Sequence, residues 1–333
     1  MTTQERIEWL KGRQTGIGGS DVAAIIGLSR YKSPLDVYNS KVQPVSEEQS
    51  QAAYWGTQLE DIVAKEFQSR TGMKVQRVNQ QLSKDGWMLA NIDRAVVNPE
   101  ISGTVRVQDE AKQAETGRML TTDAILECKT ASSYIADQWG ESQETEIVSG
   151  NVVTEHKIPI YYETQVQWYM GVTGASRCYV AVLLGGQDFR IYVVNRDDDV
   201  IKALQDQCRK FWFEHVKTET PPEPRTKEEV VQLFTKDNGE MVEADNAVAA
   251  DIGELRSLDA RIKELKAEQD VIKDRVCTAL GDRQGFLIGG EKACTFKTQS
   301  SSRFDTTLFK KEQPNVYAAY IKTTTSRVFR LTA

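Results

Sequence analysis

Asp123-Ala124-Ile125-Leu126-Glu127-Cys128-Lys129-Thr130 has the composition of a β-strand that lies inside a sheet. Side chains of a strand alternate between its two faces, so we expect Glu127 and Lys129 on one face and Leu126 and Cys128 on the other. A carboxylate and an amine then share a small space. Burying this pair is costly unless it is compensated, and a divalent cation bound with a second carboxylate would compensate it.

Asp93 is the expected second carboxylate, because it ends the short apolar run Met88-Leu89-Ala90-Asn91-Ile92. Asp followed by Glu-x-Lys is the residue pattern of a metal-dependent nuclease. Two carboxylates hold Mg²⁺ or Mn²⁺, which polarises a phosphate and lowers the pKa of a bound water, while the lysine orients that water or stabilises developing negative charge. A strand with a surface salt bridge would give the same pattern without catalysis.

Length and composition favour a soluble protein of one large or two medium domains, since 40% of the 333 residues are hydrophobic and 27% are charged. No apolar run approaches 18 residues and the polar N-terminus has no signal-peptide core, so we expect a cytoplasmic protein without a membrane segment. The five cysteines form no Cys-x-x-Cys pair, which disfavours zinc ribbons and disulfides. A net charge of −6 does not indicate a DNA-binding protein, so DNA binding would require a local basic channel.

The N-terminal region contains a candidate phosphate-binding turn. Gly16-Ile17-Gly18-Gly19-Ser20-Asp21 predicts a glycine-rich turn with Ser20 as the N-cap of a short helix. Backbone amides at a helix start can bind phosphate, and Arg13 is near enough in sequence to add a charged contact. A capped helix without any ligand also explains these residues.

Two helices carry further polar candidates. Glu60 lies beside an apolar stripe at helical spacing, where it can reach an interior site, and the stripe is formed by Leu59, Val63 and Phe67. An ordinary solvated charge is the alternative for Glu60. In the helix expected over residues 159–174, Gln165 and Gln167 are two residues apart and point in nearly opposite directions, so only one of them can face a site.

The remaining pattern of the first part predicts strands and one excursion. Residues 73–82 and 87–97 are expected to be consecutive strands, and residues 98–121, rich in Gln, Glu, Thr and Gly, a surface excursion. Residues 177–184 and 189–194 predict a β-hairpin.

A proline-rich linker at residues 219–225 separates a domain at 1–218 from an extension at 226–333. In the extension, apolar residues step by three and four around the polar Gln269, as in a heptad seam: Leu255, Leu258, Ile262, Leu265, Ile272 and Val276. This seam would pair with another chain or pack on its own domain. Short strands and a helical piece follow, so the extension is expected to be α+β, with a partner or oligomer role.

Five motifs occur in order along residues 1–218. They are Arg13 with Gly18-Gly19-Ser20-Asp21, Trp55-Gly56-Thr57-Gln58-Leu59-Glu60, Asn91-Ile92-Asp93, Leu126-Glu127-Cys128-Lys129-Thr130 and Gln165-Val166-Gln167. Together they make this part of the chain resemble the phage lambda exonuclease / YqaJ-like viral recombinase family of alkaline exonucleases. The resemblance implies an α/β fold with a restriction-endonuclease-like core, a mixed sheet flanked by helices.

The resemblance also implies roles for the central residues. Asp93 and Glu127 would ligate metal together with the backbone carbonyl of Cys128, and Lys129 would assist the nucleophilic water. The cofactor would be Mg²⁺ or Mn²⁺, as two ions.

The other matching residues would support this centre. Glu60 would lie by the second metal or its waters, and Gln165 would orient Lys129. Arg13 and Ser20 would receive the 5′-phosphate of a strand end.

The function implied by the resemblance is 5′→3′ digestion of one strand of linear double-stranded DNA. The substrate would be double-stranded DNA ends, and the exposed 3′ single strand would pass to a single-strand annealing protein (RecT/Beta-like) in phage-type recombination. We therefore expect a homo-oligomer of phage or prophage origin that acts in the bacterial cytoplasm. A structure-specific DNA endonuclease on the same fold, and a non-catalytic scaffold that binds DNA ends or a recombinase, remain alternatives.

Three features depart from the family pattern. The thirty-three residues between Asp93 and Glu127 exceed the usual family spacing, and Arg94 follows the aspartate where some members have glycine. The heptad-containing extension is absent from the compact lambda enzyme.

Overall fold

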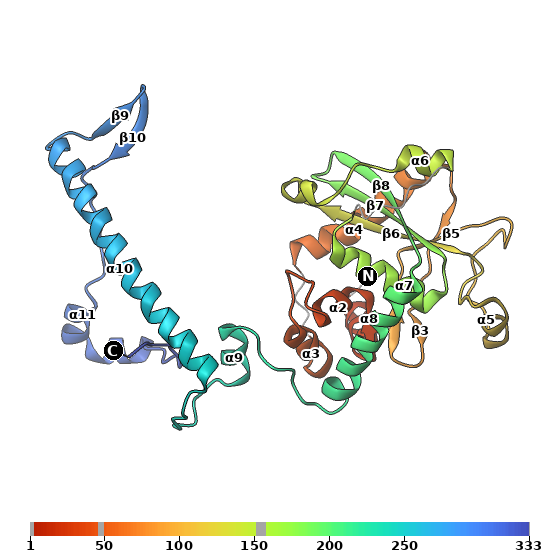
Figure 1. Ribbon diagram of the computed structural model, residues 1–333, viewed down its shortest axis with the longest axis horizontal. Coiled ribbons are helices and arrows are strands. Elements are labelled where there is room, and N and C mark those ends of the chain that lie inside the picture. Colours follow the sequence, from red (N-terminus) through yellow and green to blue (C-terminus); the bar gives the residue numbers. More distant parts are fainter. Residues whose placement is uncertain (1–2, 46–49, 151–157, 333) are drawn as a thin grey trace. The chain divides into compact units, whose positions relative to one another are not determined.

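The computed structural model describes residues 3–45, 50–150 and 158–332, and Figure 1 shows their helices and strands. The chain divides into two compact units, Met1–Glu223 and Pro224–Ala333, which we describe separately. None of the helices in the described ranges combines the length and the hydropathy that crossing a bilayer requires.

The first unit is organised by a five-stranded mixed sheet with the strand order β2-β5-β6-β7-β8. β6 and β7 are parallel from Ala124 opposite Arg177 to Ala131 opposite Leu184, and the other neighbours are antiparallel. β7 reads as a nearly continuous apolar run, as expected for a strand covered on both faces, whereas β6 is apolar over 124–126 and then carries Glu127, Lys129 and Thr130. The strands are β2 Val75–Gln76, β5 Arg94–Val96, β6 Ala124–Ala131, β7 Arg177–Leu184 and β8 Asp188–Asn195. β7 and β8 confirm the expected hairpin.

Helices cover both faces of this sheet (Figure 1). α4, Gln51–Thr71, begins at the N-cap Ser50, ends at Gly72 and buries Val63, Ala64 and Phe67 in a core shared with Leu126, Tyr179 and Ile191. α7, Ile160–Thr173, covers the opposite face and packs on α2 and α8. The mixed α/β core flanked by helices is therefore confirmed. The other helices are α1 Thr3–Gln14, α2 Gly19–Ile25, α3 Pro34–Val42, α6 Glu144–Ser149, α8 Asp198–Phe211, a 3₁₀ helix at Ser133–Gln138 and a π-helical turn at Trp212–Val216.

A second, three-stranded sheet has the order β1-β4-β3, with β1 Ile17–Gly18, β3 Leu82–Lys84 and β4 Met88–Ala90. The expected single strands over 73–82 and 87–97 are therefore wrong, because each span is divided between the two sheets. No glycine or proline marks the break in either span, and only tertiary pairing shows where the chain changes sheet. Asp93 lies at this crossover, between β4 and β5.

The excursion between β5 and β6 is partly anchored to the core. It contains α5, Glu110–Thr116, which begins at Asp109 and ends at Gly117. Its flanks are held inside: Val105 and Leu120 are buried, and the Met119 amide donates to the Thr173 carbonyl at 2.7 Å. The expected surface excursion is thus mostly exposed over 99–104 and around α5 and is anchored to the core at Val105 and near Leu120.

The second unit is built on α10, Asn246–Leu280, a helix of 35 residues that begins at the N-cap Asp245 and contains the whole heptad seam. An antiparallel hairpin of β9, Gly285–Ile288, and β10, Glu291–Thr295, follows it. The shorter helices are α9 Lys227–Leu233, α11 Thr306–Glu312 and α12 Pro314–Tyr320. The expected α+β extension with a heptad helix is confirmed.

Candidate active site

Glu127 and Lys129 emerge from β6 on the face that α7 covers, as the alternation of strand side chains predicts. Lys129 Nζ donates to Glu127 Oε1 at 2.6 Å and to Gln165 Oε1 at 3.1 Å. Gln165 Nε2 in turn donates to Glu127 Oε1 at 2.6 Å. Gln167 turns away and bonds backbone groups after β8, which confirms that only one of the two glutamines faces the carboxylates.

Asp93 lies beside this group. Its Oδ2 accepts a hydrogen bond from the Cys128 amide at 2.7 Å. The pairing of β5 with β6 reaches Arg94 opposite Leu126 and stops there, so the carboxylate occupies the place of the next ladder partner. The N–H and C=O of one strand residue point to the same edge, so the Cys128 carbonyl is directed to the side on which Asp93 lies.

Each of the two carboxylates, Asp93 and Glu127, makes ionisation of the other less favourable. Burial raises the pKa of Asp93 well above its usual value, and the nearby Glu127 carboxylate raises it further. Burial also raises the pKa of Glu127, although Lys129 opposes this shift. For Lys129, burial lowers the pKa, but the attraction of Glu127 and Asp93 outweighs burial and the pKa is raised. The lysine therefore stays a cation, while the acids lack enough compensating positive charge.

The oxygen atoms at this point fit a hard divalent cation. Glu127 Oε2 is buried and finds no hydrogen-bond partner among the residues that the structure describes, whereas Oε1 is fully engaged. Leaving a buried carboxylate oxygen without a donor is costly, and a metal ion would satisfy it. Together with Asp93 and the Cys128 carbonyl, it supplies the oxygen ligands that Mg²⁺ and Mn²⁺ prefer. Among the described residues, no three His, Cys, Asp or Glu side chains already form a metal-binding group.

Glu60 faces the same cavity but is bound by arginines. Its Oε1 accepts hydrogen bonds from Arg94 and, at 3.2 Å, from Arg77. Arg94 is 4% exposed and also contacts Asp61 and the Asp93 carbonyl, so it ties α4 to the residue at the sheet crossover. Service of Glu60 at a second metal stays a prediction, and the positive charges of Arg94 and Arg77 would compete with the ion for this carboxylate.

Arg13 and Ser20 are brought together, with Arg13 Nη2 donating to Ser20 Oγ at 2.6 Å. Gly19 allows this placement: a Cβ added there would lie 2.5 Å from Cε1 of Tyr169, so α2 can approach α7 closely only with glycine. Beneath them, Asp21 accepts from Lys41 at 2.7 Å in a buried ion pair. No pattern in the sequence indicated this lysine.

A cavity of about 420 Å³ joins both groups. Its wall includes Arg13, Ser20, Glu60, Asp93, Glu127 and Gln165. Residues from α2, α4, α7, β6 and the sheet crossover therefore converge on one space that is open enough to admit part of a substrate.

Two tyrosines of α7 complete the surroundings and were missed in the sequence. The Tyr162 ring centre lies 4.8 Å from Lys129 Nζ, and the Tyr169 hydroxyl accepts from Gln165 Nε2 at 3.2 Å. Residues 162, 165 and 169 are spaced by three and four, which places them on one helix face. From this spacing, the two tyrosines could have been predicted to lie on the same helix face as Gln165.

Comparisons with known proteins point to one family. The family model of the YqaJ-like viral recombinase domain matches residues 8–176, a range that contains every site residue predicted above. The uncharacterized protein YqaJ of Bacillus subtilis (strain 168) is 32% identical over 335 residues, which cover 97% of this chain and 93% of that protein. Among solved structures, the alkaline exonuclease LHK-Exo from Laribacter hongkongensis is 18% identical, with a TM-score of 0.44 over 64% of this chain and 93% of its own. A phage-related exonuclease from Haemophilus somnus 129PT is 10% identical, with a TM-score of 0.41 over 61% of this chain and 96% of its own.

Proposed function

This chain belongs to the YqaJ-like viral recombinase family, and we propose that it is a DNA exonuclease that requires a divalent metal ion. In finer terms, we propose Mg²⁺- or Mn²⁺-dependent 5′→3′ digestion of one strand of linear double-stranded DNA. The observation that carries the proposal is the unpartnered, buried Glu127 Oε2 next to Asp93, two acids that a cation would stabilise in their ionised forms.

The chain's own residues would divide the work around that ion. Asp93, Glu127 and the Cys128 carbonyl would hold it, and Glu60 would serve a second ion or its waters. Bound metal would polarise the scissile phosphate and lower the pKa of a water molecule. Lys129 remains protonated and can donate a hydrogen bond to the attacking water or to the oxygen on which negative charge develops.

Arg13 and Ser20 would receive the 5′-phosphate of the strand end at the other side of the cavity. The proposal is supported by their contact with each other and by their place in the same wall as Glu127. A guanidinium and a hydroxyl are suitable donors for phosphate oxygens. This arrangement would set the distance between the strand end and the bond that is cut.

The product would be a duplex end with a protruding 3′ strand. We propose that a single-strand annealing recombinase (RecT/Beta-like) uses this strand in homologous recombination, in a bacterial host cell. The chemistry of the product supports this step, since annealing requires an exposed single strand.

An end-labelled digestion assay tests the proposal. Linear duplexes with a 5′-phosphate or a 5′-hydroxyl, and a covalently closed circle, are incubated with Mg²⁺, Mn²⁺ or EDTA. We expect stepwise loss of the 5′-labelled strand from the phosphorylated duplex, no cutting of the circle, and loss of activity in EDTA and in Lys129→Ala. Cutting of the circle, or of a branched duplex added as a further substrate, would instead indicate an endonuclease, and equal rates for Lys129→Ala would remove this lysine from the mechanism.

A further inference from the structure

The heptad seam of α10 is not covered by the described part of the second unit. Its apolar side chains are between 37% and 53% exposed: Leu255, Leu258, Ile262, Leu265, Ile272 and Val276. A continuous apolar stripe on a helix of 35 residues is the pattern of an interaction surface, because exposed apolar area of this extent is costly in water.

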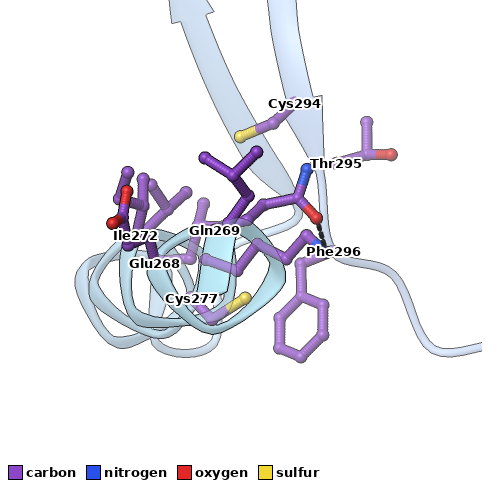
Figure 2. A pocket seen from close by; sticks show the side chains of 11 residues that line it. Glu268, Gln269, Ile272, Cys277, Cys294, Thr295 and Phe296 are labelled. Carbon is purple, nitrogen blue, oxygen red and sulfur yellow. Dashed lines mark hydrogen bonds between the residues drawn. The ribbon is translucent and has the colours of Figure 1, made fainter. Parts of the chain in front are cut away.

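The C-terminal end of the seam forms one wall of a groove. The opposite wall is the end of β10, and Figure 2 shows Cys294, Thr295 and Phe296 there, beside Gln269 and Ile272 of α10. The groove has a volume of about 500 Å³ and is lined mainly by apolar atoms of the seam. Its shape would admit an apolar helix that runs along α10.

We propose that the occupant is α10 of a second copy of this chain, bound as an antiparallel coiled coil. In the proposed register, Ile262 of one copy lies opposite Leu265 of the other. Leu255 then meets Ile272 of the second copy, so the start of each helix enters the groove beside the partner's β10. The stretch that enters carries Val248 and Leu255 at seam positions and Ile252 on the flank, while Asp251 takes the seam position opposite Val276.

Charge complementarity selects this orientation and this register. Residues that flank a coiled-coil seam form ion pairs between the helices, and these pairs set which partners and orientations are allowed. In an antiparallel pair, each flank of one helix faces the same flank of the second helix. In the proposed register every charged pair then has opposite signs: Glu254 with Arg275, Arg261 with Glu268, and Asp259 with Lys266.

Other arrangements place like charges together. In a parallel pair each flank faces the other flank of the second helix, so Glu254 would meet Asp259 and Arg261 would meet Lys266, and of the charged flank residues only Glu268 would meet an opposite charge, Lys273. If the antiparallel pair is shifted by one heptad in one direction, Arg261 meets Arg261 of the second copy and Glu254 meets Glu268. If it is shifted in the other direction, Glu268 meets Glu268 of the second copy and Arg261 meets Arg275. Such contacts are destabilising.

Gln269 is the polar exception in the seam, and its oxygen is bonded within its own helix. Its Oε1 accepts from Lys273 Nζ at 2.8 Å, the bond drawn as a dashed line in Figure 2. This oxygen therefore has a donor without the second glutamine that a parallel pair would place opposite it. In the antiparallel register Gln269 lies opposite Leu258 of the second copy.

Charge reversal in the full-length chain tests the pairing by sedimentation velocity. Arg261→Glu converts two complementary pairs of the symmetric dimer into like-charged pairs, so the dissociation constant should rise about tenfold. Adding Glu268→Arg in the same chain should restore association to about the wild-type level, because the two signs are exchanged together. Lys263→Glu is the matched control: it makes the same change in charge on the same helix, on the face opposite the seam, and should leave association unchanged.

Each other outcome overturns the proposal. A wild-type chain that stays monomeric at all concentrations, or an Arg261→Glu variant that associates like Lys263→Glu, would show that the seam does not bind a second copy. Tighter association of Arg261→Glu would indicate the parallel pair, in which the new glutamate faces Lys266. Circular dichroism checks that each variant keeps its helix content, so a loss of association is not a loss of fold.

Discussion

Replacing Gln165 with alanine removes the hydrogen bonds by which α7 holds the two charged residues of β6. The amide accepts from Lys129 at 3.1 Å and donates to Glu127 at 2.6 Å. Without it, Lys129 and Glu127 keep their hydrogen bond to each other and Lys129 keeps the Tyr162 ring beside it, but the Glu127 carboxylate loses a donor that lowers its pKa. We expect weaker metal binding and slower cleavage rather than a loss of the fold.

The size of the effect follows from these contacts. A hydrogen bond to a charged group contributes about 1.5–3 kcal/mol. Loss of one partner that orients a metal ligand costs roughly 10–100-fold in metal affinity or activity, which corresponds to about 1.4–2.8 kcal/mol. The two estimates agree, so we expect Gln165→Ala to raise the Mg²⁺ concentration for half-maximal cleavage by about 10–100-fold.

Gln167→Ala is the matched control. Gln167 lies on the same helix and is 3% exposed, against 6% for Gln165, but its amide bonds only backbone groups after β8. Both variants should lose about 1–3 kcal/mol of stability in urea unfolding, since each leaves buried polar groups without partners. Only Gln165→Ala should change the Mg²⁺ titration of cleavage of a 5′-phosphorylated duplex. Equal shifts for the two variants would refute the positioning role.

Three further predictions follow from the same contacts. The folded-state pKa values of Asp93 and Glu127 are raised, so above about pH 4 the metal-free native state holds more protons than the unfolded chain. Its free energy of unfolding should therefore fall as the pH rises towards and through the raised pKa values. Mg²⁺ should therefore raise the melting temperature more at pH 8 than at pH 5, and Asp93→Asn should lose most of this gain; a gain independent of pH would contradict the site. Arg13→Ala should reduce the preference for a 5′-phosphate over a 5′-hydroxyl end by about tenfold in parallel digestions, and an unchanged ratio would place the phosphate elsewhere. Arg94→Ala should destabilise the protein by about 2 kcal/mol in urea unfolding, because it leaves acids near the site without a buried partner, whereas the half-exposed Arg77→Ala should change stability by less than about 1 kcal/mol.

The parts of the site that depend on local spacing could be predicted from the sequence. Strand alternation placed Glu127 and Lys129 together and sent Leu126 into the core shared with α4. Helical spacing separated Gln165 from Gln167 in the same way. These patterns involve neighbours along the chain, so no tertiary information was needed, although the chemical roles of these residues stay predictions.

The parts that depend on pairing between distant segments could not be predicted. The run that ends at Asp93 reads as one strand, and only the three-stranded sheet shows that it stops at Ala90. Arg94 gave no indication of its partners Glu60 and Asp61, which lie on α4 and more than thirty residues earlier. Its burial arises from packing against a helix that the local sequence does not specify.

The topology also explains how the long connection between Asp93 and Glu127 is tolerated. β5 begins beside the site at Arg94 and runs away from it, while β6 starts at the far end and returns, with Ala95 opposite Ile125 and Arg94 opposite Leu126. The excursion that carries α5 therefore leaves and re-enters at the ends of these strands remote from Glu127. The free-energy cost of closing a loop rises only slowly with the length of the loop. Asp93 and Glu127 are held together by the pairing of two short strands, so residues can be inserted between them without moving either carboxylate.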